Sequence, residues 1–453
     1  MGFLHALGLH KAMRPFDRVV RPILNFRADQ RLEQCWNVQD LRKAAQARMH
    51  PMCFGYLDSG ADDELALERS TSAFDDLELH YRNLSGLERP ISTATKFVGG
   101  EAIGLPFFPA PCAGHRMFHT EGEVATATVA AERQVPFCLS TFATCSFEQV
   151  AAAQLAVSSA STAAASSTAV ASSSTAGTAA VTPRVFQLYV LRERELVSGL
   201  LERAAASGFR HVALTVDLTW FGNRERDKRT GFTVPPTYSP RQVAGALARP
   251  AWAWDFAATE EYRYALMAPD VAAESIASFI NAKIDPRFDW DDGKWLCEEW
   301  PRIVARADET TAKAAATAAA AAAEAGNAGA APSTTAAGIA DAAEPLPPPP
   351  PPPPSVLLKG VVRADEAARA VREAGFGGVW VSNHGGRQLE TAPPTIDVLP
   401  SIREAMGPEA FLVLDGGVRR GHHVAKAVAL GADAVAVGRP YLFVVLHTTH
   451  HLL

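Results

Sequence analysis

Eight short apolar runs, each followed by a stretch of helical character, are the feature that most constrains the fold of this 453-residue chain. Continuous apolar runs are typical of strands buried on both faces, and they alternate here with helices that end at glycines. Eight such units predict an α/β fold, a (β/α)8 TIM barrel with its active site at the carboxyl ends of the strands. A doubly wound open sheet is the competing architecture. The predicted strands are residues 106–110, 136–140, 185–189, 211–216, 356–358, 378–381, 411–414 and 434–437.

Two low-complexity segments interrupt this alternation. Residues 154–182 are almost wholly Ala, Ser, Thr and Val, and residues 307–354 run from an alanine-rich tract into eight consecutive prolines. Neither composition can build a specific core, so both segments are interpreted as insertions; the prolines would form an extended spacer or a ligand for an SH3-like or WW-like module. The expected organisation is a basic extension, residues 1–37, followed by one barrel domain, residues 38–453, that carries both insertions.

Charge and composition exclude several classes of protein. The formal net charge of -6 implies no strongly basic face, which argues against a general nucleic-acid-binding protein. Six cysteines occur without a C-x-x-C pair or zinc spacing, so we predict no metal site and a reducing compartment. No transmembrane segment is predicted. Because residues 1–37 are basic like an organelle presequence, we expect a mitochondrial location, with a peroxisomal or cytoplasmic one as alternatives.

Polar side chains follow strand after strand, at the end where a barrel places its active site. One such residue is common in any α/β protein, but helix capping alone does not explain the whole series. Glycines and arginines after the last two strands also suit a phosphate group. The series, in chain order, is Gln187, Tyr189, Asp217, Arg224, Lys359, Ser382, His384, Arg387, Asp415, Arg419, Gly438 and Arg439.

The loop at residues 382–388, which reads S-N-H-G-G-R-Q, carries the most informative pair. The imidazole of His384 can accept a proton near neutral pH, and the guanidinium of Arg387 can hold a carboxylate through two parallel hydrogen bonds. Together they suit chemistry on a small acid. Taken alone, His384 could equally be a strand-end histidine that caps a turn.

The ordered motifs carry a family resemblance. The sequence resembles the FMN-dependent L-2-hydroxy-acid oxidase and dehydrogenase family, which includes glycolate oxidase and L-lactate dehydrogenase, from about residue 38 to residue 441 outside the two insertions. The run at 111–119, P-C-A-G-H-R-M-F-H, is closer to bacterial-type lactate dehydrogenases than to plant glycolate oxidases. The other matching motifs are Y-L-D-S-G-A-D-D-E at 56–64, H-T-E-G-E at 119–123, F-Q-L-Y at 186–189, L-T-V-D at 214–217, L-K-G-V at 358–361, S-N-H-G-G-R-Q at 382–388, D-G-G-V-R-R-G at 415–421 and G-R-P at 438–440.

The resemblance implies roles for individual positions. His384 would be the catalytic base, and Asp217 would orient it and stabilise the imidazolium. Tyr189 would hydrogen-bond the substrate hydroxyl, and Arg387 would clamp the substrate carboxylate. The implied substrate-binding set is Tyr56, Tyr189, Arg224, His384 and Arg387. The implied FMN-binding set is Pro111, Cys112, Ala113, Ser140, Gln187, Thr215, Lys359, Ser382, Asp415, Gly416, Gly417, Arg419, Gly438 and Arg439.

The implied function is FMN-dependent oxidation of an L-2-hydroxy acid, of the L-lactate or glycolate type, to the 2-oxo acid. Oxygen, a quinone or a cytochrome would then accept the electrons, and we expect a homo-oligomer. The alternative is a catalytically impaired flavin-binding barrel that acts as a binding or scaffold protein. Cys112, Gly114, Phe142 and Trp220 depart from the family pattern, which leaves the substrate open.

Two connections lead to further expectations. Residues 222–283, after the fourth strand, contain Trp252 and Trp254 without a clear helical repeat and are predicted to form a lid over the active site. After G-R-P at 438–440 we expect a missing or truncated final helix. Loss of about four buried apolar side chains would forfeit on the order of 6–12 kcal/mol, so we expect a marginally stable or aggregation-prone chain.

Overall fold

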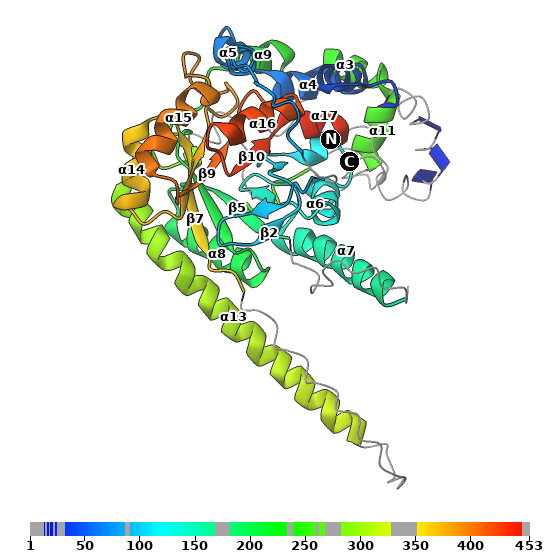
Figure 1. Cartoon of the computed structure of the whole chain (residues 1–453). Coiled ribbons are helices and arrows are strands. Elements are labelled where there is room, and N and C mark those ends of the chain that lie inside the picture. Colours follow the sequence, from blue (N-terminus) through cyan, green and yellow to red (C-terminus); the bar gives the residue numbers. More distant parts are fainter. Residues whose placement is uncertain are drawn as a thin grey trace.

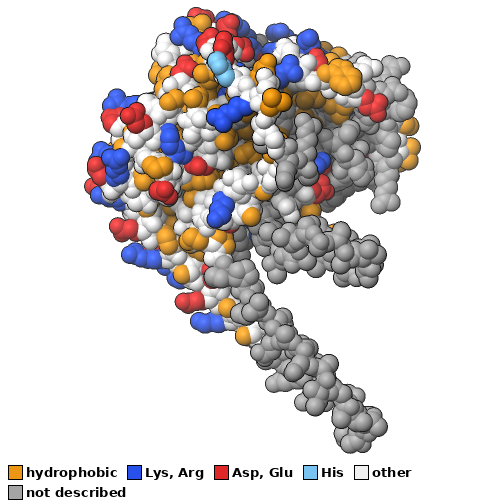
Figure 2. Space-filling model, viewed as in Figure 1, with side chains coloured by type: hydrophobic (Ala, Val, Ile, Leu, Met, Phe, Trp, Pro, Cys, Tyr) orange, Lys and Arg blue, Asp and Glu red, His pale blue; other side chains and the backbone are white. Residues whose placement is uncertain are grey.

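A computed structural model of the chain describes residues 32–86, 91–167, 182–232, 239–258, 262–267, 282–327 and 351–445, together with a few positions between 13 and 24. Within these ranges, no helix is long and apolar enough to cross a bilayer. On the face shown in Figure 2, basic and acidic side chains are interspersed, in keeping with the small net charge.

Eight parallel strands form a nearly closed barrel (Figure 1). They pair in the order β3-β10-β9-β8-β7-β6-β5-β4, so that the last strand in the chain returns to the first and the doubly wound alternative is wrong. All eight predicted strands are confirmed. Their bounds are β3 Phe107–Pro109, β4 Phe137–Ser140, β5 Arg184–Tyr189, β6 His211–Thr215, β7 Ser355–Val361, β8 Gly378–Val381, β9 Phe411–Leu414 and β10 Ala434–Val437.

Strand β7 is longer than predicted. Gly360 has a φ of 105°, and the register shifts between Lys359 and Val361, so a bulge carries the strand past the lysine. A glycine tolerates this conformation because it lacks a Cβ atom. Pairing therefore continues to Val361, and the side chain of Lys359 lies within the carboxyl end of the sheet instead of on a loop.

Helices cover the outside of the barrel. Gly208, Gly375, Gly407 and Gly431 follow helices and have positive φ, in agreement with the predicted glycine ends. Ser146 and Gln149 form a capping box at the start of α7. The covering helices are α6 Glu123–Glu132, α7 Phe147–Ser167, α8 Arg194–Ala206, α13 Trp290–Asn327, α14 Ala364–Arg372, α15 Thr395–Met406, α16 Gly421–Ala429 and α17 Arg439–Val445.

The carboxyl ends of the strands lie under a further group of helices, at the top of Figure 1. Arg387, after β8, donates to the carbonyl oxygen of Tyr56 at 2.7 Å, which fixes this layer over the barrel. The layer contains α3 Val38–Arg48, α4 Pro51–Asp58, α5 Leu65–Ser72 and α9 Glu225–Thr230, and the short helices η1 His115–Met117, α10 Pro240–Leu247 and α11 Pro250–Ala258 occur in other connections.

The amino end of the barrel is closed by an antiparallel hairpin, β1 Thr95–Lys96 with β2 Ala102–Ile103. Phe97, at its turn, packs edge-on against Phe108 and Phe411, with ring centroids 5.5 and 5.1 Å apart, and Phe108 packs edge-on against Trp380. These aromatic side chains are at most 2% exposed, apart from Phe411. Burial of each contributes about 1.5–3 kcal/mol, so this cluster is a major part of the core.

A helix extends into each of the two low-complexity segments. Helix α7 continues to Ser167, and Gln154 is buried, with its Oε1 accepting a hydrogen bond from Arg184 at 2.8 Å; the first insertion therefore begins after residue 154. Helix α13 extends through the alanine-rich tract to Asn327, because alanine has the highest helix propensity. The first four of the eight prolines, residues 347–350, lie outside the described residues.

Helices also form in the connection after β6 and in the segment after β10. Where the structure describes residues 222–283, they contain the helices α9, α10 and α11, although the sequence shows no clear helical repeat there. The lid over the active site stays a prediction. After β10, α17 buries Leu442 and Phe443, while residues 446–453 lie outside the described part of the chain. The expected low stability stays a prediction.

Candidate active site

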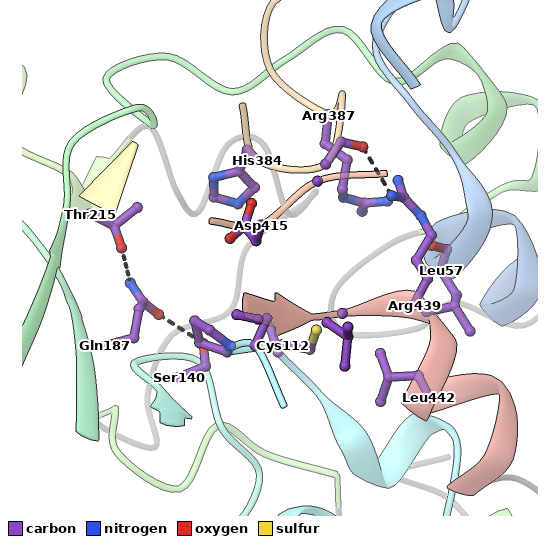
Figure 3. Close-up of a pocket in the computed structure, with 18 of the residues that line it drawn as sticks. Leu57, Cys112, Ser140, Gln187, Thr215, His384, Arg387, Asp415, Arg439 and Leu442 are labelled. Atoms are coloured by element: carbon purple, nitrogen blue, oxygen red, sulfur yellow. Dashed lines mark hydrogen bonds between the residues drawn. The ribbon is translucent and has the colours of Figure 1, made fainter. Parts of the chain in front are cut away.

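A large pocket opens at the carboxyl ends of the strands (Figure 3), with about 1210 Å³ of empty space that includes open solvent. Every predicted site residue except Asp217 and Ser382 lines it. Those two lie directly behind the lining, hydrogen-bonded to His384 and Lys359.

His384 stands between two partners. Its Nδ1 lies 2.9 Å from Oδ1 of Asp217, and its Nε2 lies 3.4 Å from the hydroxyl of Tyr189. A carboxylate can only accept, so Nδ1 carries the proton and Nε2 presents a lone pair to the pocket. The ring reaches this place because His384, Gly385 and Gly386 have φ values of 56°, 64° and 72°, a left-handed turn that histidine tolerates poorly and glycine easily.

Asp217 is a buried carboxylate held in its charged form. Burial alone would raise its pKa, but the charge and hydrogen bond of His384, together with the charge of Lys359, outweigh burial and lower the pKa below its ordinary value. Its other oxygen, Oδ2, has no hydrogen-bond partner among the described residues. Asp217 can therefore stabilise the positive charge that the imidazole ring gains when Nε2 takes up a proton.

Four guanidinium groups converge on the pocket, and none forms an ion pair with a carboxylate within the described ranges. Arg387 donates to the carbonyl oxygens of Tyr56 and Ser59 at 2.7 and 2.9 Å, while Arg439 donates to those of Leu57, Gly385 and Ser59. The other two groups belong to Arg224 and Arg419.

The electrostatic state of this arginine cluster points to anionic ligands. Burial, together with the neighbouring cations, lowers the pKa of Arg439 to about 9, and burial lowers the pKa of Arg419 and of Arg224 to about 10. Buried positive charges are costly when no anion compensates them. The cluster is therefore suited to a carboxylate and a phosphate supplied from outside the chain.

Lys359, by contrast, is compensated within the protein. Its Nζ lies 2.8 Å from Oγ of Ser382 and 3.2 Å from Oδ2 of Asp415. Burial would lower the pKa of the ammonium group, but Asp415 and Asp217 outweigh burial and raise it, so the group keeps its charge. Asp415 is itself held by Ser382 and by Nε1 of Trp380, at 2.7 and 2.9 Å. The result is a fixed cation at the pocket wall.

A row of neutral polar groups lines the side of the pocket formed by β4, β5 and β6 (Figure 3). Gln187 accepts from the hydroxyl of Ser140 at 3.1 Å and donates to the hydroxyl of Thr215 at 3.0 Å. Such a row can exchange hydrogen bonds with the edge of a planar heteroaromatic ring.

The glycines after β9 form a close-packed cradle at the other end of the pocket. Gly416 and Gly417 have φ values of 99° and 75°, and a Cβ atom on Gly417 would lie 1.7 Å from the carbonyl oxygen of Ser70. Helix α16 begins shortly afterwards at Gly421. A polar row for a ring, a tight glycine turn and unpaired guanidinium groups together fit the predicted FMN.

Sequence reasoning missed part of the apolar wall. Phe142 was noted only as a departure from the family pattern. Its ring packs at a tilt against the rings of Tyr189 and Tyr264, with centroids 5.2 and 5.5 Å apart. Tyr264 gave no sequence signal, because it lies in the long connection after β6 and far from any motif. The other missed residues are Leu57, Ala110, Phe118, Leu218, Phe221, Gly385, Val418, Ala436, Val437 and Leu442.

The chain is similar to characterised flavoproteins. An L-lactate oxidase from Nostoc sp. is 31% identical over 408 residues, which cover 90% of this chain and 86% of that protein. An L-lactate dehydrogenase from Caulobacter vibrioides is 31% identical over 409 residues, with 89% and 85% covered. A crystal structure of the monotopic membrane protein (S)-mandelate dehydrogenase has a TM-score of 0.66 at 26% identity, covering 90% of this chain and 88% of that one.

The family model described as FMN-dependent dehydrogenase matches residues 45–325 and 352–449. The match includes all eight strands of the barrel and every residue that lines the pocket. The chain therefore belongs to the family of FMN-dependent dehydrogenases.

Proposed function

We propose that this protein oxidises an L-2-hydroxy acid to the corresponding 2-oxo acid, with FMN as the acceptor of two electrons. The observation that carries the proposal is the placement of His384, whose Nε2 faces the pocket beside the Tyr189 hydroxyl. The same pocket holds guanidinium groups that have no carboxylate partner among the described residues. A base and an anion clamp on one wall match a substrate that carries a hydroxyl beside a carboxylate.

Arg387 is proposed to bind the substrate carboxylate. Backbone carbonyl oxygens of Tyr56 and Ser59 hold its Nη1, and its guanidinium carbon lies 4.9 Å from the centre of the Tyr56 ring. This leaves the other N–H groups of the guanidinium for the substrate. Arg224, whose guanidinium lies 4.1 Å from the Phe221 ring, would add a second positive charge.

Tyr189 and His384 are proposed to act at the reacting carbon. The Tyr189 hydroxyl and the His384 Nε2 lie 3.4 Å apart, so both can contact one substrate hydroxyl. Oxidation removes two electrons and two protons from the substrate. His384 takes one proton at Nε2, and the other would leave with the electrons to FMN or pass to solvent. Asp217 stabilises the imidazolium, because its buried carboxylate already faces Nδ1. In a carbanion mechanism that proton comes from the α-carbon of the substrate, and in a hydride-transfer mechanism it comes from the hydroxyl oxygen.

FMN, when bound, accepts the two electrons from the substrate. Gln187, Ser140 and Thr215 would hydrogen-bond its ring, and Lys359 would place a fixed positive charge where negative charge develops on reduction. The remaining members of the predicted cofactor set, Pro111, Cys112, Ala113, Ser382, Asp415, Gly416, Gly417, Arg419, Gly438 and Arg439, would hold the rest of the ring, the ribityl chain and the phosphate.

The substrate's α-substituent is proposed to be apolar. Phe142 packs against both Tyr189 and Tyr264, and all three rings line the pocket, as does Phe221. Such an aromatic lining accepts a methyl or larger hydrocarbon group and disfavours a charged one. L-Lactate and (S)-mandelate are therefore the first substrates to test, with glycolate as a substrate that has no substituent.

The test is anaerobic mixing of the purified yellow protein with each acid while flavin absorbance is recorded. Bleaching by an L-2-hydroxy acid, and not by its D-enantiomer, is the expected result. Bound flavin that no L-2-hydroxy acid bleaches would overturn the proposal and favour a binding or scaffold role. Mixing the reduced enzyme with oxygen, a quinone or a cytochrome would identify the second substrate, and light scattering would test the proposed homo-oligomer.

A further inference from the structure

Gln388, directly after Arg387, joins the loop that follows β6 to the loop that follows β8. Its Nε2 donates to the carbonyl oxygens of Asp217 and Trp220 at 3.1 and 2.9 Å. Its Oε1 accepts from the backbone N–H of Gly222 at 3.4 Å and from Nη2 of Arg224 at 3.2 Å. The Nε2 amino group of Gln388 faces two carbonyl oxygens, and its Oε1 faces two N–H groups. All four hydrogen bonds therefore agree with one orientation of the Gln388 amide.

The two loops meet without free space. A Cβ atom on Gly222 would lie 2.2 Å from the carbonyl oxygen of Arg387 and 2.8 Å from Cα of Gln388. Nε of Arg224 also donates to the carbonyl oxygen of Arg387, at 3.3 Å. The backbones are therefore in direct contact, and the Gln388 amide fixes how one loop lies on the other.

The loop after β6 carries Asp217, whose carboxylate holds the imidazole ring of His384 in place. The Asp217 carbonyl accepts from Gln388, while the carboxylate of the same residue lies 2.9 Å from Nδ1 of His384. A shift of this backbone would move the carboxylate relative to the imidazole ring. Arg387, by contrast, is anchored separately through the carbonyl oxygens of Tyr56 and Ser59.

We propose that Gln388 is a positioning residue for the reaction: its amide fixes the backbone of Asp217 and the guanidinium of Arg224 relative to the loop that bears His384. The inference rests on the proposed function. Because a displacement of about 1 Å at a reacting centre can cost on the order of 100-fold in rate, loss of the amide reduces kcat. It leaves KM nearly unchanged, since the separately anchored Arg387 still binds the carboxylate.

The experiment compares Gln388→Met, which keeps the length of the side chain and removes all four hydrogen bonds, with the wild-type holoenzyme. The rate of flavin reduction at saturating L-2-hydroxy acid should fall about 10–100-fold, and KM should rise less than about threefold. The affinity for the 2-oxo acid product, measured from its effect on the spectrum of the oxidised flavin, should stay within about threefold of wild type for the same reason.

A matched control is Gln149→Met, which removes an exposed glutamine of the α7 capping box that does not line the pocket. It should leave kcat, KM and product affinity unchanged. Gln388→Glu is a second variant in case the methionine folds poorly: it keeps an acceptor oxygen but turns an oxygen toward the carbonyls of Asp217 and Trp220, so kcat should also fall.

The outcomes separate this inference from the function on which it rests. Wild-type protein whose flavin no L-2-hydroxy acid reduces would overturn both. Normal wild-type reduction with unchanged kcat in the two Gln388 variants would overturn the positioning role alone. Loss of FMN, or a fall in Tm much larger than that of Gln149→Met, would show a structural role instead and would also overturn it.

Discussion

The two ends of the barrel differ in whether they leave cationic side chains without a carboxylate partner. At the amino end, the buried His211 faces Glu101 at 2.5 Å, and the hairpin seals the barrel with Phe97. At the carboxyl end, four guanidinium groups have no carboxylate partner among the described residues, and burial lowers the pKa of Arg224, Arg419 and Arg439. The difference separates stability, gained by pairing and packing, from binding, which needs charge left uncompensated.

The largest effect is expected from His384→Ala, at the carboxyl end. Removing a general base typically costs about 100–10,000-fold in rate, so anaerobic flavin reduction should slow by that order. FMN should stay bound, because the proposed phosphate contacts, and all of the proposed ring contacts except that of Ser382, come from other loops. The exposed His80 offers a control, His80→Ala, with wild-type kinetics expected. Near-normal reduction by the His384 variant would remove the histidine from the reaction.

At the amino end, Phe97→Ala should act on stability alone. Deleting a buried phenylalanine costs about 3–5 kcal/mol, because it removes apolar contacts and leaves a cavity. The free energy of unfolding, from urea titration of the holoenzyme, should fall by that amount, while KM and kcat of the folded fraction stay at wild-type values. A change in either kinetic constant would show that the two ends of the barrel are coupled.

Arg387→Lys tests whether binding of the substrate carboxylate at the carboxyl end needs the planar geometry of a guanidinium group or only its positive charge. An ammonium group keeps the charge but cannot make two parallel hydrogen bonds to a carboxylate. Because a hydrogen bond to a charged group is worth about 1.5–3 kcal/mol, KM should rise about 10–100-fold with a smaller change in kcat. Arg403→Lys, at an arginine paired with Asp433 outside the pocket, should leave KM unchanged. An unaltered KM in Arg387→Lys would contradict the clamp.

The smallest effect concerns Asp58, a carboxylate near the carboxyl end that pairs outward with Arg42 and Arg226. Burial alone would raise its pKa, but the hydrogen bonds and charges of both arginines lower it overall. With a folded pKa below the unfolded value of about 3.9, its stabilisation is complete above about pH 5 and is lost as the pH falls through the folded pKa.

Asp58→Asn should therefore reduce the free energy of unfolding by about 1 kcal/mol near pH 7. The difference in the free energy of unfolding between wild type and Asp58→Asn should become smaller below about pH 4. Urea titrations at pH 7, 5 and 3.5 would measure it. A difference in the free energy of unfolding that is the same at all three pH values would show that the effect comes from packing and not from charge.

The eight strands and the ring of polar residues were predictable because both are local signals. An apolar run marks a strand, and the first polar residue after it, such as Asp217 or Lys359, marks the carboxyl end. The bulge at Gly360 was not predictable, since it depends on how β7 pairs with β8. Helix propensity of the alanine tract carried α13 to Asn327, where composition alone suggested only an insertion.

The site residues that escaped prediction share one property: their role depends on contacts between distant segments. Tyr264 reaches the pocket from a connection without any motif, and Gln388 matters only because the loop after β6 lies against it. The conformation of His384, with φ of 56°, likewise follows from neighbouring glycines and from α5, which packs on Gly386 so closely that a Cβ atom would lie 2.5 Å from the Leu67 nitrogen.

The uncompensated arginines have a consequence for how much folded protein a cell retains. Mutual repulsion and desolvation of these groups weigh against the empty form, while any anion that binds only the folded chain shifts the folding equilibrium by mass action. A ligand present at 100 times its dissociation constant adds about 2.7 kcal/mol to the free energy of unfolding. We therefore expect the amount of folded protein to rise with the supply of its flavin.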